Sequence, residues 1–225
     1  MDNALRLYFT KVEMHERNST KLVALNRPIK KISACHTGRK AAKALEEEAD
    51  NLLAEIYMCI EAKVMLTTNL WNKVGLANGS MSTIHNMSWD VRQDITSMSS
   101  VILVKFDGYT GPAFPDCGEG IIPIFPVTRQ FEYKSVSCSR TQFPLRLAYA
   151  ITVHKSQWMS LDVAIMNLRK KQHCLGLAYV TVSRVRTAGG VVFEEPFDFE
   201  HFKYKESDIS QDRAADIVLR NIQLL

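Results

Sequence analysis

The 225-residue sequence has no long hydrophobic run and no recognisable export signal. Its longest apolar stretches, GIIPIFPV and LAYAITV, are far shorter than the roughly 20 residues that a membrane-spanning helix needs. The first residues also lack the apolar core of a secretory signal peptide. We therefore expect an intracellular protein that has no membrane partner.

Paired cysteines and a phosphate loop are absent as well. The five cysteines stand singly, with no Cys-x-x-Cys pair and no histidines at metal-ligand spacing, at Cys35, Cys59, Cys117, Cys138 and Cys174. We expect reduced, mostly buried thiols and no metal site. None of the ten glycines is followed by lysine, so the sequence contains no Gly-x-x-x-x-Gly-Lys loop of the kind that cradles nucleotide phosphates.

What the chain does have is an uneven distribution of basic charge. The net charge is +4, yet ten Lys or Arg and only two acids lie between Arg129 and Phe193, which gives that stretch a charge of +8. The ten cations are Arg129, Lys134, Arg140, Arg146, Lys155, Arg169, Lys170, Lys171, Arg184 and Arg186. This concentration favours a phosphate-rich partner, and the alternative is a solvated basic surface that has no partner.

Hydrophobic periodicity predicts a protein of alternating strands and helices. A strand is expected at 4–10, a helix or a turn-rich segment of weak periodicity from Lys11 to Leu25, and a longer helix over 39–60, where apolar residues recur at helical spacing. A β-rich stretch follows, with Asn-Gly and Asp-Gly turn signals and a strand at 100–106.

The last third continues the alternation of strands and helices. We expect strands at 145–153, 163–168 and 189–195, a helix or a turn leading into one at 156–164, a helix near 175–186, and an amphipathic helix at 207–225.

Two motifs in this last third are specific. The stretches LRLAYAITVHKSQ (145–157) and GLAYVTVSRVRT (176–187) resemble the fifth and sixth motifs of the Pif-type (petite integration frequency) ATP-dependent DNA helicases of superfamily 1. AKVMLTTNLWNKVGLANGSM (62–81) and LRLYFTKVEMHERN (5–18) are similar to two further segments of that family, in the same order. The resemblance covers roughly residues 5–197.

The resemblance implies an α/β fold: the second RecA-like, parallel-sheet motor domain of a P-loop NTPase, with a small SH3-like β insert. It divides the chain into 1–57 (first part of the RecA-like domain), 58–135 (β insert), 136–205 (remainder of the RecA-like domain, with both motifs) and 206–225 (C-terminal helix). In such motors ATP lies between two RecA-like domains and single-stranded DNA crosses both. The implied partners are single-stranded DNA and a missing N-terminal motor domain, and ATP with Mg²⁺ is expected only when that domain is present.

The resemblance also assigns roles to individual residues. Arg184 matches the arginine finger, whose planar cation stabilises charge on the γ-phosphate; a structural pairing with an acid at a helix start is the alternative. Gln157 and Arg186 would line the ATP cleft, although Arg186 equally suits a buttress of its loop. The other assignments are a turn that grips the DNA backbone, formed by Thr152, His154, Lys155 and Ser156, and a structural turn at Asn78 and Gly79.

Aromatic and acidic residues offer two further candidates. Trp71, Trp89 and Trp158 present rings on which bases stack, although core packing is the preferred interpretation of the first two. The strand VVFEE (191–195) imitates one that ends in magnesium-binding acids. It lies downstream of the arginine motif, where the family has a plain structural strand, and we therefore assign it no metal.

Three positions depart from the family pattern, because glycines are replaced by Glu61, Ser82 and Trp158. A side chain costs about 1 kcal/mol or more wherever such a glycine holds positive φ or allows a close backbone approach. The three losses suggest relaxed constraint, as in a truncated or transposon-derived copy.

Three functional hypotheses follow. The first is the C-terminal part of an ATP-dependent DNA helicase of repair, recombination or telomere maintenance, inactive alone and nuclear, with mitochondria as the other compartment. The second is a non-catalytic module that binds single-stranded nucleic acid. The third is a decayed copy without function. The oligomeric state is left open.

Overall fold

A computed structural model describes residues 4–88, 101–157, 159–168 and 177–197. Trp89, Trp158, the basic run 169–171 and the predicted helix at 207–225 lie outside the described residues. The chain divides into a larger unit, Met1–Leu5 with Thr10–Ile151, and a smaller unit, Arg6–Phe9 with Thr152–Leu225. The domain boundaries expected from the family resemblance stay predictions. No helix in the described ranges is long and apolar enough to cross a membrane.

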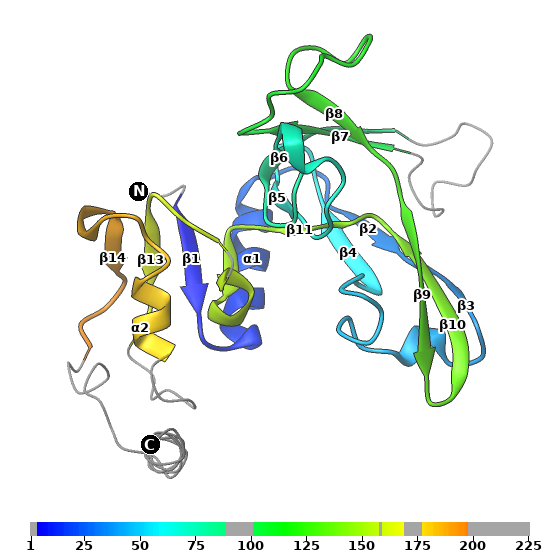
Figure 1. Cartoon of the computed structure of the whole chain (residues 1–225), viewed down its shortest axis with the longest axis horizontal. Helices are drawn as coiled ribbons and strands as arrows, with labels where there is room; N and C mark the ends of the chain where they lie inside the picture. Colours follow the sequence, from blue (N-terminus) through cyan, green and yellow to red (C-terminus); the bar gives the residue numbers. More distant parts are fainter. Residues whose placement is uncertain (1–3, 89–100, 158, 169–176, 198–225) are drawn as a thin grey trace, which may run out of the picture. The chain divides into compact units, whose positions relative to one another are not determined.

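A four-stranded sheet contains the parallel strands of the fold (Figure 1). Its order is β12-β1-β13-β14, with bounds Ala150–Thr152, Leu5–Tyr8, Ala164–Met166 and Val191–Phe193. Strands β13 and β14 pair in parallel, and helix α2 (Leu177–Val182) lies between them in sequence. The expected strands at 4–10, 163–168 and 189–195 are therefore confirmed. For 156–164, where a helix or a turn leading into one was expected, the described residues form no helix, and a 3-10 turn at Val153–Ser156 precedes β13.

Helix α1 (Lys11–Ala24) forms where the sequence predicted it. Its N-cap is Thr10, whose hydroxyl accepts from the Glu13 N–H (3.3 Å) and also bonds to the Glu13 carboxylate (2.6 Å). This reciprocal arrangement satisfies a backbone donor that the first turn would otherwise leave unpaired. The buried face of the helix consists of Met14, Asn18 and Leu22, spaced four residues apart.

A five-stranded antiparallel sheet forms the β-rich part of the larger unit. Its order is β11-β5-β6-β7-β8, with bounds Leu145–Leu147, Lys63–Leu66, Met81–Ser88, Val101–Phe106 and Ile121–Ile124. Along β7 the buried residues alternate with more exposed ones, as expected of a strand that has one face in the core. The hydrophobic core of this unit collects side chains from all five strands.

Two smaller sheets complete the larger unit. Strand β2 (Lys30–Ser33) pairs with β4 (Glu55–Met58). Strand β10 (Val136–Gln142) lies between β3 (Cys35–Thr37) and β9 (Val127–Tyr133). The β9–β10 hairpin turns at Lys134 and Ser135, both at positive φ, which is the backbone conformation that a tight two-residue hairpin turn demands.

The long helix expected at 39–60 is wrong. This segment contains a 3-10 turn at Ala41–Lys43, two residues at positive φ (Asp50 and Asn51), and then strand β4. Ala41, Ala49, Leu52 and Ile56 of the predicted stripe are buried, but Leu45 and Ile60 are exposed (67% and 40%), so the stripe does not form one helix face. Arg140 donates to the carbonyls of Ala41 (3.1 Å), Ala44 (2.7 Å) and Leu52 (2.7 Å), the groups that an α-helix would use internally.

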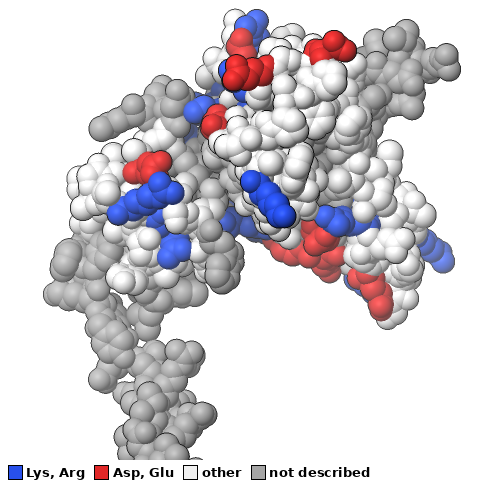
Figure 2. All heavy atoms as spheres, turned by 45° about the horizontal axis from the view of Figure 1, so that its top comes forward, with Lys and Arg blue, Asp and Glu red and all other residues white. Residues whose placement is uncertain are grey.

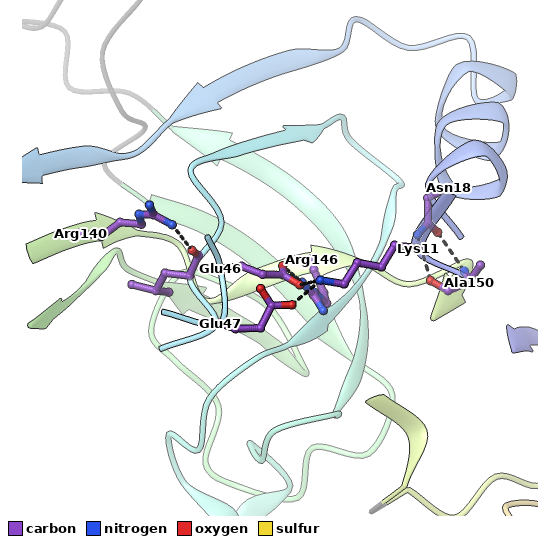
Figure 3. A network of polar contacts seen from close by, with 8 residues as sticks. Lys11, Asn18, Glu46, Glu47, Arg140, Arg146 and Ala150 are labelled. Atoms are coloured by element: carbon purple, nitrogen blue, oxygen red, sulfur yellow. Dashed lines mark hydrogen bonds and ion pairs between the residues drawn. The ribbon is translucent and has the colours of Figure 1, made fainter. Parts of the chain in front are cut away.

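Arg140 is fully buried, although its charge suggested a surface position. Its guanidinium lies 5.8 Å from the centre of the Phe131 ring, and one of its three backbone hydrogen bonds is drawn in Figure 3. Burial lowers the pKa of Arg140, while nearby Glu48 opposes that effect. Arg140 thus holds the segment 41–52 from strand β10, although it lies 88 residues after Leu52 in the sequence.

We predict that Arg140→Met lowers the free energy of unfolding by about 3 kcal/mol or more, because three buried carbonyls lose their donors. Urea titration followed by circular dichroism measures the change. Arg129→Met is the matched control, since that side chain is 39% exposed in its ion pair with Asp50 and should cost less than about 1 kcal/mol. Equal losses from the two substitutions would contradict the structural role of Arg140.

His36 lies directly opposite Arg140 on β3, and its Nδ1 is buried without a hydrogen-bond partner. Burial lowers the pKa of His36, and the charge of Arg140 lowers it further. The unfolded chain therefore takes up this proton before the folded chain does. Stability should be complete above a pH of about 6.5 and should fall as the pH drops from there through the lower pKa of the folded state.

We predict that His36→Gln flattens this dependence of stability on pH. The free energy of unfolding is measured between about pH 5 and pH 7.5, within the range of about pH 5 to 8 in which histidine usually titrates. His85→Gln, an exposed histidine on β6, is the control and should leave the slope in place. An identical slope in the chain lacking His36 would show that another group is responsible.

Glu61 occupies one of the positions at which the family has glycine, and its backbone is left-handed, with φ of 70°. Its N–H donates to the Ile84 carbonyl at 2.8 Å, so the turn into β5 is fixed by a backbone bond. The carboxylate pairs with Arg27 at 2.7 Å, with both side chains about half exposed (55% and 49%). The strain that the missing glycine implied is present here, and an exposed ion pair does little to offset it.

We predict that Glu61→Gly raises the free energy of unfolding by about 1 kcal/mol, or the melting temperature by roughly 2 to 4 °C, because it relieves the left-handed strain. Glu61→Ala, which removes the ion pair but keeps a Cβ, should give no gain. Both are measured by thermal melting. If the alanine variant gained as much as the glycine variant, relief of backbone strain would not be the cause.

Candidate functional site

The predicted DNA-gripping turn follows strand β12 directly. Thr152 is 6% exposed and Ser156 is fully buried, with its hydroxyl donating to the Val153 carbonyl at 2.7 Å. His154 is exposed and Lys155 is half-buried. Of the four predicted residues, His154 is thus exposed, Lys155 is partly exposed, and Thr152 and Ser156 lie inside, where Ser156 closes the turn.

Arg184 is held by uncharged groups of the smaller unit. Its Nε donates to the Val180 carbonyl (3.1 Å), its Nη2 to the Ser183 hydroxyl (3.0 Å), and its Nη1 to the Gln157 carbonyl. None of these acceptors is an acid, so this arrangement differs from the acid-paired alternative considered from the sequence. The guanidinium instead joins the arginine motif to the last residue of the His154–Lys155 turn.

Backbone hydrogen bonds link the same two segments further along. The Leu161 N–H donates to the Arg184 carbonyl (2.8 Å), and the Arg186 N–H donates to the Leu161 carbonyl (3.0 Å). Gly190 lies close by, where an added Cβ would clash with the Asp162 carbonyl. Sequence reasoning assigned no role to Gly190, and nothing in the local pattern marks a close approach between residues so far apart.

Arg186 forms an ion pair at the surface of the smaller unit. Its Nη1 lies 3.0 Å from the Asp162 carboxylate, and both side chains are largely exposed (66% and 81%). An exposed pair of this kind contributes little energy. The contact with Asp162 is of the kind expected if Arg186 supports its own loop, which was the second role that the sequence suggested.

Glu194 of the VVFEE strand serves a structural purpose. Its carboxylate lies 3.1 Å from Arg6 and accepts from the Tyr8 hydroxyl at 3.2 and 3.3 Å and from Asn167 at 3.4 Å. These partners belong to the sheet and its flanks in the smaller unit. Across the described ranges, no three His, Cys, Asp or Glu side chains gather in a way that suits a metal ion.

The basic stretch does not form one surface. Arg140 is buried, Arg129 lies 3.0 Å from Asp50, and Arg146 lies 2.5 Å from Glu46 with only 12% of its side chain exposed. Figure 2 shows basic and acidic side chains interspersed on the visible face. These three cations are therefore engaged within the larger unit, whereas the sequence treated the whole stretch as one basic region.

The first part of the motif 145–157 is anchored within the larger unit. Arg146 shares Glu46 with Lys11, which also pairs with Glu47 (Figure 3). The hydrogen bond to Glu47 raises the pKa of Lys11. Asn18, also drawn in Figure 3, bonds to the backbone at Ala150. Asn18 lies in a segment that is similar to the family, but the sequence assigned it no role. The feature that could have revealed it is a polar residue among the buried positions of a helix.

The remaining predicted positions lie in the larger unit. Asn78 and Gly79 form a turn closed by the Ser80 N–H on the Ala77 carbonyl (3.0 Å), and Gly79 has φ of +94°. Glycine suits that conformation because it has no Cβ. Trp71 is 44% exposed, so the preferred interpretation of it as a core residue is wrong.

Comparisons with known proteins point to one family. No protein-family model matches the chain. It is 33% identical over 179 residues to ATP-dependent DNA helicase PIF7 of Trypanosoma brucei brucei, covering 69% of the chain and 17% of that protein. It is 27% identical over 205 residues to ATP-dependent DNA helicase Pif1 of Campylobacter jejuni, covering 80% of the chain and 43% of that protein. The chain spans less than half the length of these relatives.

Solved structures share the fold. Pif1 helicase from Candida albicans matches with a TM-score of 0.69 at 23% identity, covering 95% of this chain and 49% of that one. Bacteroides Pif1 bound to single-stranded DNA matches with a TM-score of 0.64 at 22% identity, covering 95% and 46%. The chain therefore has an α/β RecA-like fold and belongs to the Pif-type family of ATP-dependent DNA helicases.

Proposed function

We propose that this chain serves as the second RecA-like motor domain of a Pif-type helicase, contributing DNA contacts and an arginine to a complete enzyme. The observation that carries the proposal is the hydrogen bond from Arg184 to the Gln157 carbonyl. Gln157, itself assigned to the ATP cleft, directly follows the turn that carries His154 and Lys155, so this bond links the arginine motif to the turn assigned to DNA. A motor needs such a connection, because each nucleotide state must change the grip on the strand.

The ATP side of the proposal rests on the charge of Arg184. The three acceptors that the described residues provide are neutral, so only hydrogen bonds to these uncharged groups, and no ion pair with a described acid, break when the guanidinium turns toward a phosphate. Charge that develops on phosphate oxygens in the transition state is stabilised by such a donor. The sequence has no phosphate loop, and we therefore propose ATP and Mg²⁺ binding only for the enzyme that includes a first motor domain.

The DNA side rests on the turn at Val153–Ser156. One cation and one imidazole face outward from a short, internally bonded turn, an arrangement that contacts a sugar-phosphate backbone without reading bases. Solved relatives have been described bound to single-stranded DNA and at forked duplex DNA. By extension we propose nuclear roles in DNA repair, recombination or telomere maintenance, for which the family relationship is the support.

A non-catalytic module that binds single-stranded nucleic acid is the second candidate. The lack of a phosphate loop favours it, because DNA contact needs no nucleotide. Both candidates require the turn to bind DNA, and they differ only in whether a first motor domain acts with it.

We predict weak, sequence-independent and salt-sensitive binding of single-stranded DNA by the whole chain. His154→Ala with Lys155→Ala should weaken binding and lower the slope of log affinity against log salt by roughly 0.7, the value for one phosphate contact on a single strand. Fluorescence anisotropy with a labelled oligothymidine, repeated over a series of salt concentrations, measures both quantities.

Lys134→Ala is the matched control for this prediction. It removes one exposed positive charge from the β9–β10 hairpin, away from the turn in sequence. If Lys134→Ala reduced affinity and slope as much as the double substitution, binding would reflect general charge and not this turn. Affinity that does not change with salt would also contradict the proposal.

A further inference from the structure

Asn18 is a buried carboxamide in the otherwise apolar face of α1. It lies one helical turn from Met14 and from Leu22, and only 5% of it is exposed. Its Oδ1 accepts from the N–H groups of Tyr149 (3.1 Å) and Ala150 (2.9 Å), and its Nδ2 donates to the Ala150 carbonyl (2.9 Å). All of its bonding therefore goes to two consecutive residues of the 145–157 motif.

These bonds fall where strand pairing is interrupted. Strand β11 ends at Leu147 and β12 begins at Ala150, so Tyr149 lies between the two ladders. Backbone groups that are buried without a partner cost roughly 1 to 3 kcal/mol each, and Asn18 supplies the missing partners. A carboxamide suits the position because it offers both an acceptor and a donor from one rigid plane.

The same short segment also bonds to Lys63 of β5. The Ala148 N–H donates to the Lys63 carbonyl (3.0 Å), and the Lys63 N–H donates to the Tyr149 hydroxyl (3.1 Å). Burial raises the pKa of Tyr149, so its phenol stays protonated. Hydrogen bonds to Lys63 and to Asn18 together fix the backbone at 148–150.

We propose that Asn18 is a positioning residue for the DNA-contacting turn. Ala150 lies only four residues before His154, and β12 leads into the turn without an intervening loop. Release of the backbone at 149–150 therefore moves the point from which the turn starts, although Asn18 contacts no DNA. The inference rests on the proposed function, because it assigns to Asn18 a part in DNA binding by that turn.

The test compares Asn18→Leu with Gln142→Leu. Gln142 is a fully buried carboxamide on β10 that also serves only backbone groups, donating to the Ile32 carbonyl (3.2 Å) and accepting from the Phe143 N–H (2.9 Å). Each substitution removes a buried carboxamide from the larger unit, together with three backbone hydrogen bonds at Asn18 and two at Gln142. A general loss of stability should therefore affect the two variants alike, whereas a positioning role belongs to Asn18 alone.

We predict that Asn18→Leu weakens binding of a labelled oligothymidine by roughly tenfold, the equivalent of one lost well-placed hydrogen bond. Gln142→Leu should stay within about twofold of the unchanged chain, because its bonds lie outside the motif. Binding is measured well below the melting temperature of both variants. Hydrogen exchange of the amides at 149–157 should accelerate in Asn18→Leu and not in Gln142→Leu.

Three outcomes would overturn the inference. Unchanged affinity and exchange in Asn18→Leu would remove the role of Asn18, and equal loss in both variants would show a general effect of stability. Absence of DNA binding by the unchanged chain would overturn the proposed function and the inference with it. If Asn18→Leu does not fold, Asn18→Asp keeps the acceptor for both N–H groups, and a smaller loss in the same direction is expected.

Discussion

The larger unit depends on a buried guanidinium that bonds to backbone carbonyls. Arg140 donates to three carbonyls between Ala41 and Leu52, which replaces the internal bonding that a helix would have provided there. Because backbone groups that leave water must find partners, this one side chain decides the conformation of a segment far away in sequence. Asn18 and Gln142 serve backbone groups in the same way at two other interruptions of regular structure.

The smaller unit applies the same chemistry to its candidate site. Arg184 donates to a carbonyl, as Arg140 does, but it is only half-buried and so remains near solvent. Burial shields the bonds of Arg140 from water, whereas partial exposure leaves those of Arg184 open to exchange with water. The difference between a fixed and a releasable arginine therefore lies in solvent access and not in the type of acceptor.

Sequence reasoning succeeded where the signal is local and failed where the cause is distant. The strand β7 follows from the alternation of apolar residues, and the motif 145–157 was identified by its residues. The helix over 39–60 failed because its apolar spacing was real, yet the partner of its carbonyls lies on β10. The burial of Thr152 and Ser156 could not be predicted either, because a motif gives residue types and not the side to which each one points.

The replaced glycines bear on whether the chain is a decayed copy. Glu61 does hold left-handed backbone, whereas Ser82 lies inside strand β6 and its buried hydroxyl donates to the Val64 carbonyl at 3.1 Å. A buried hydroxyl without a partner would cost free energy, and the bond to the Val64 carbonyl avoids that cost. Local compensation at Ser82 favours a chain that is still constrained to fold, and it weakens the argument that three departures from glycine amount to decay.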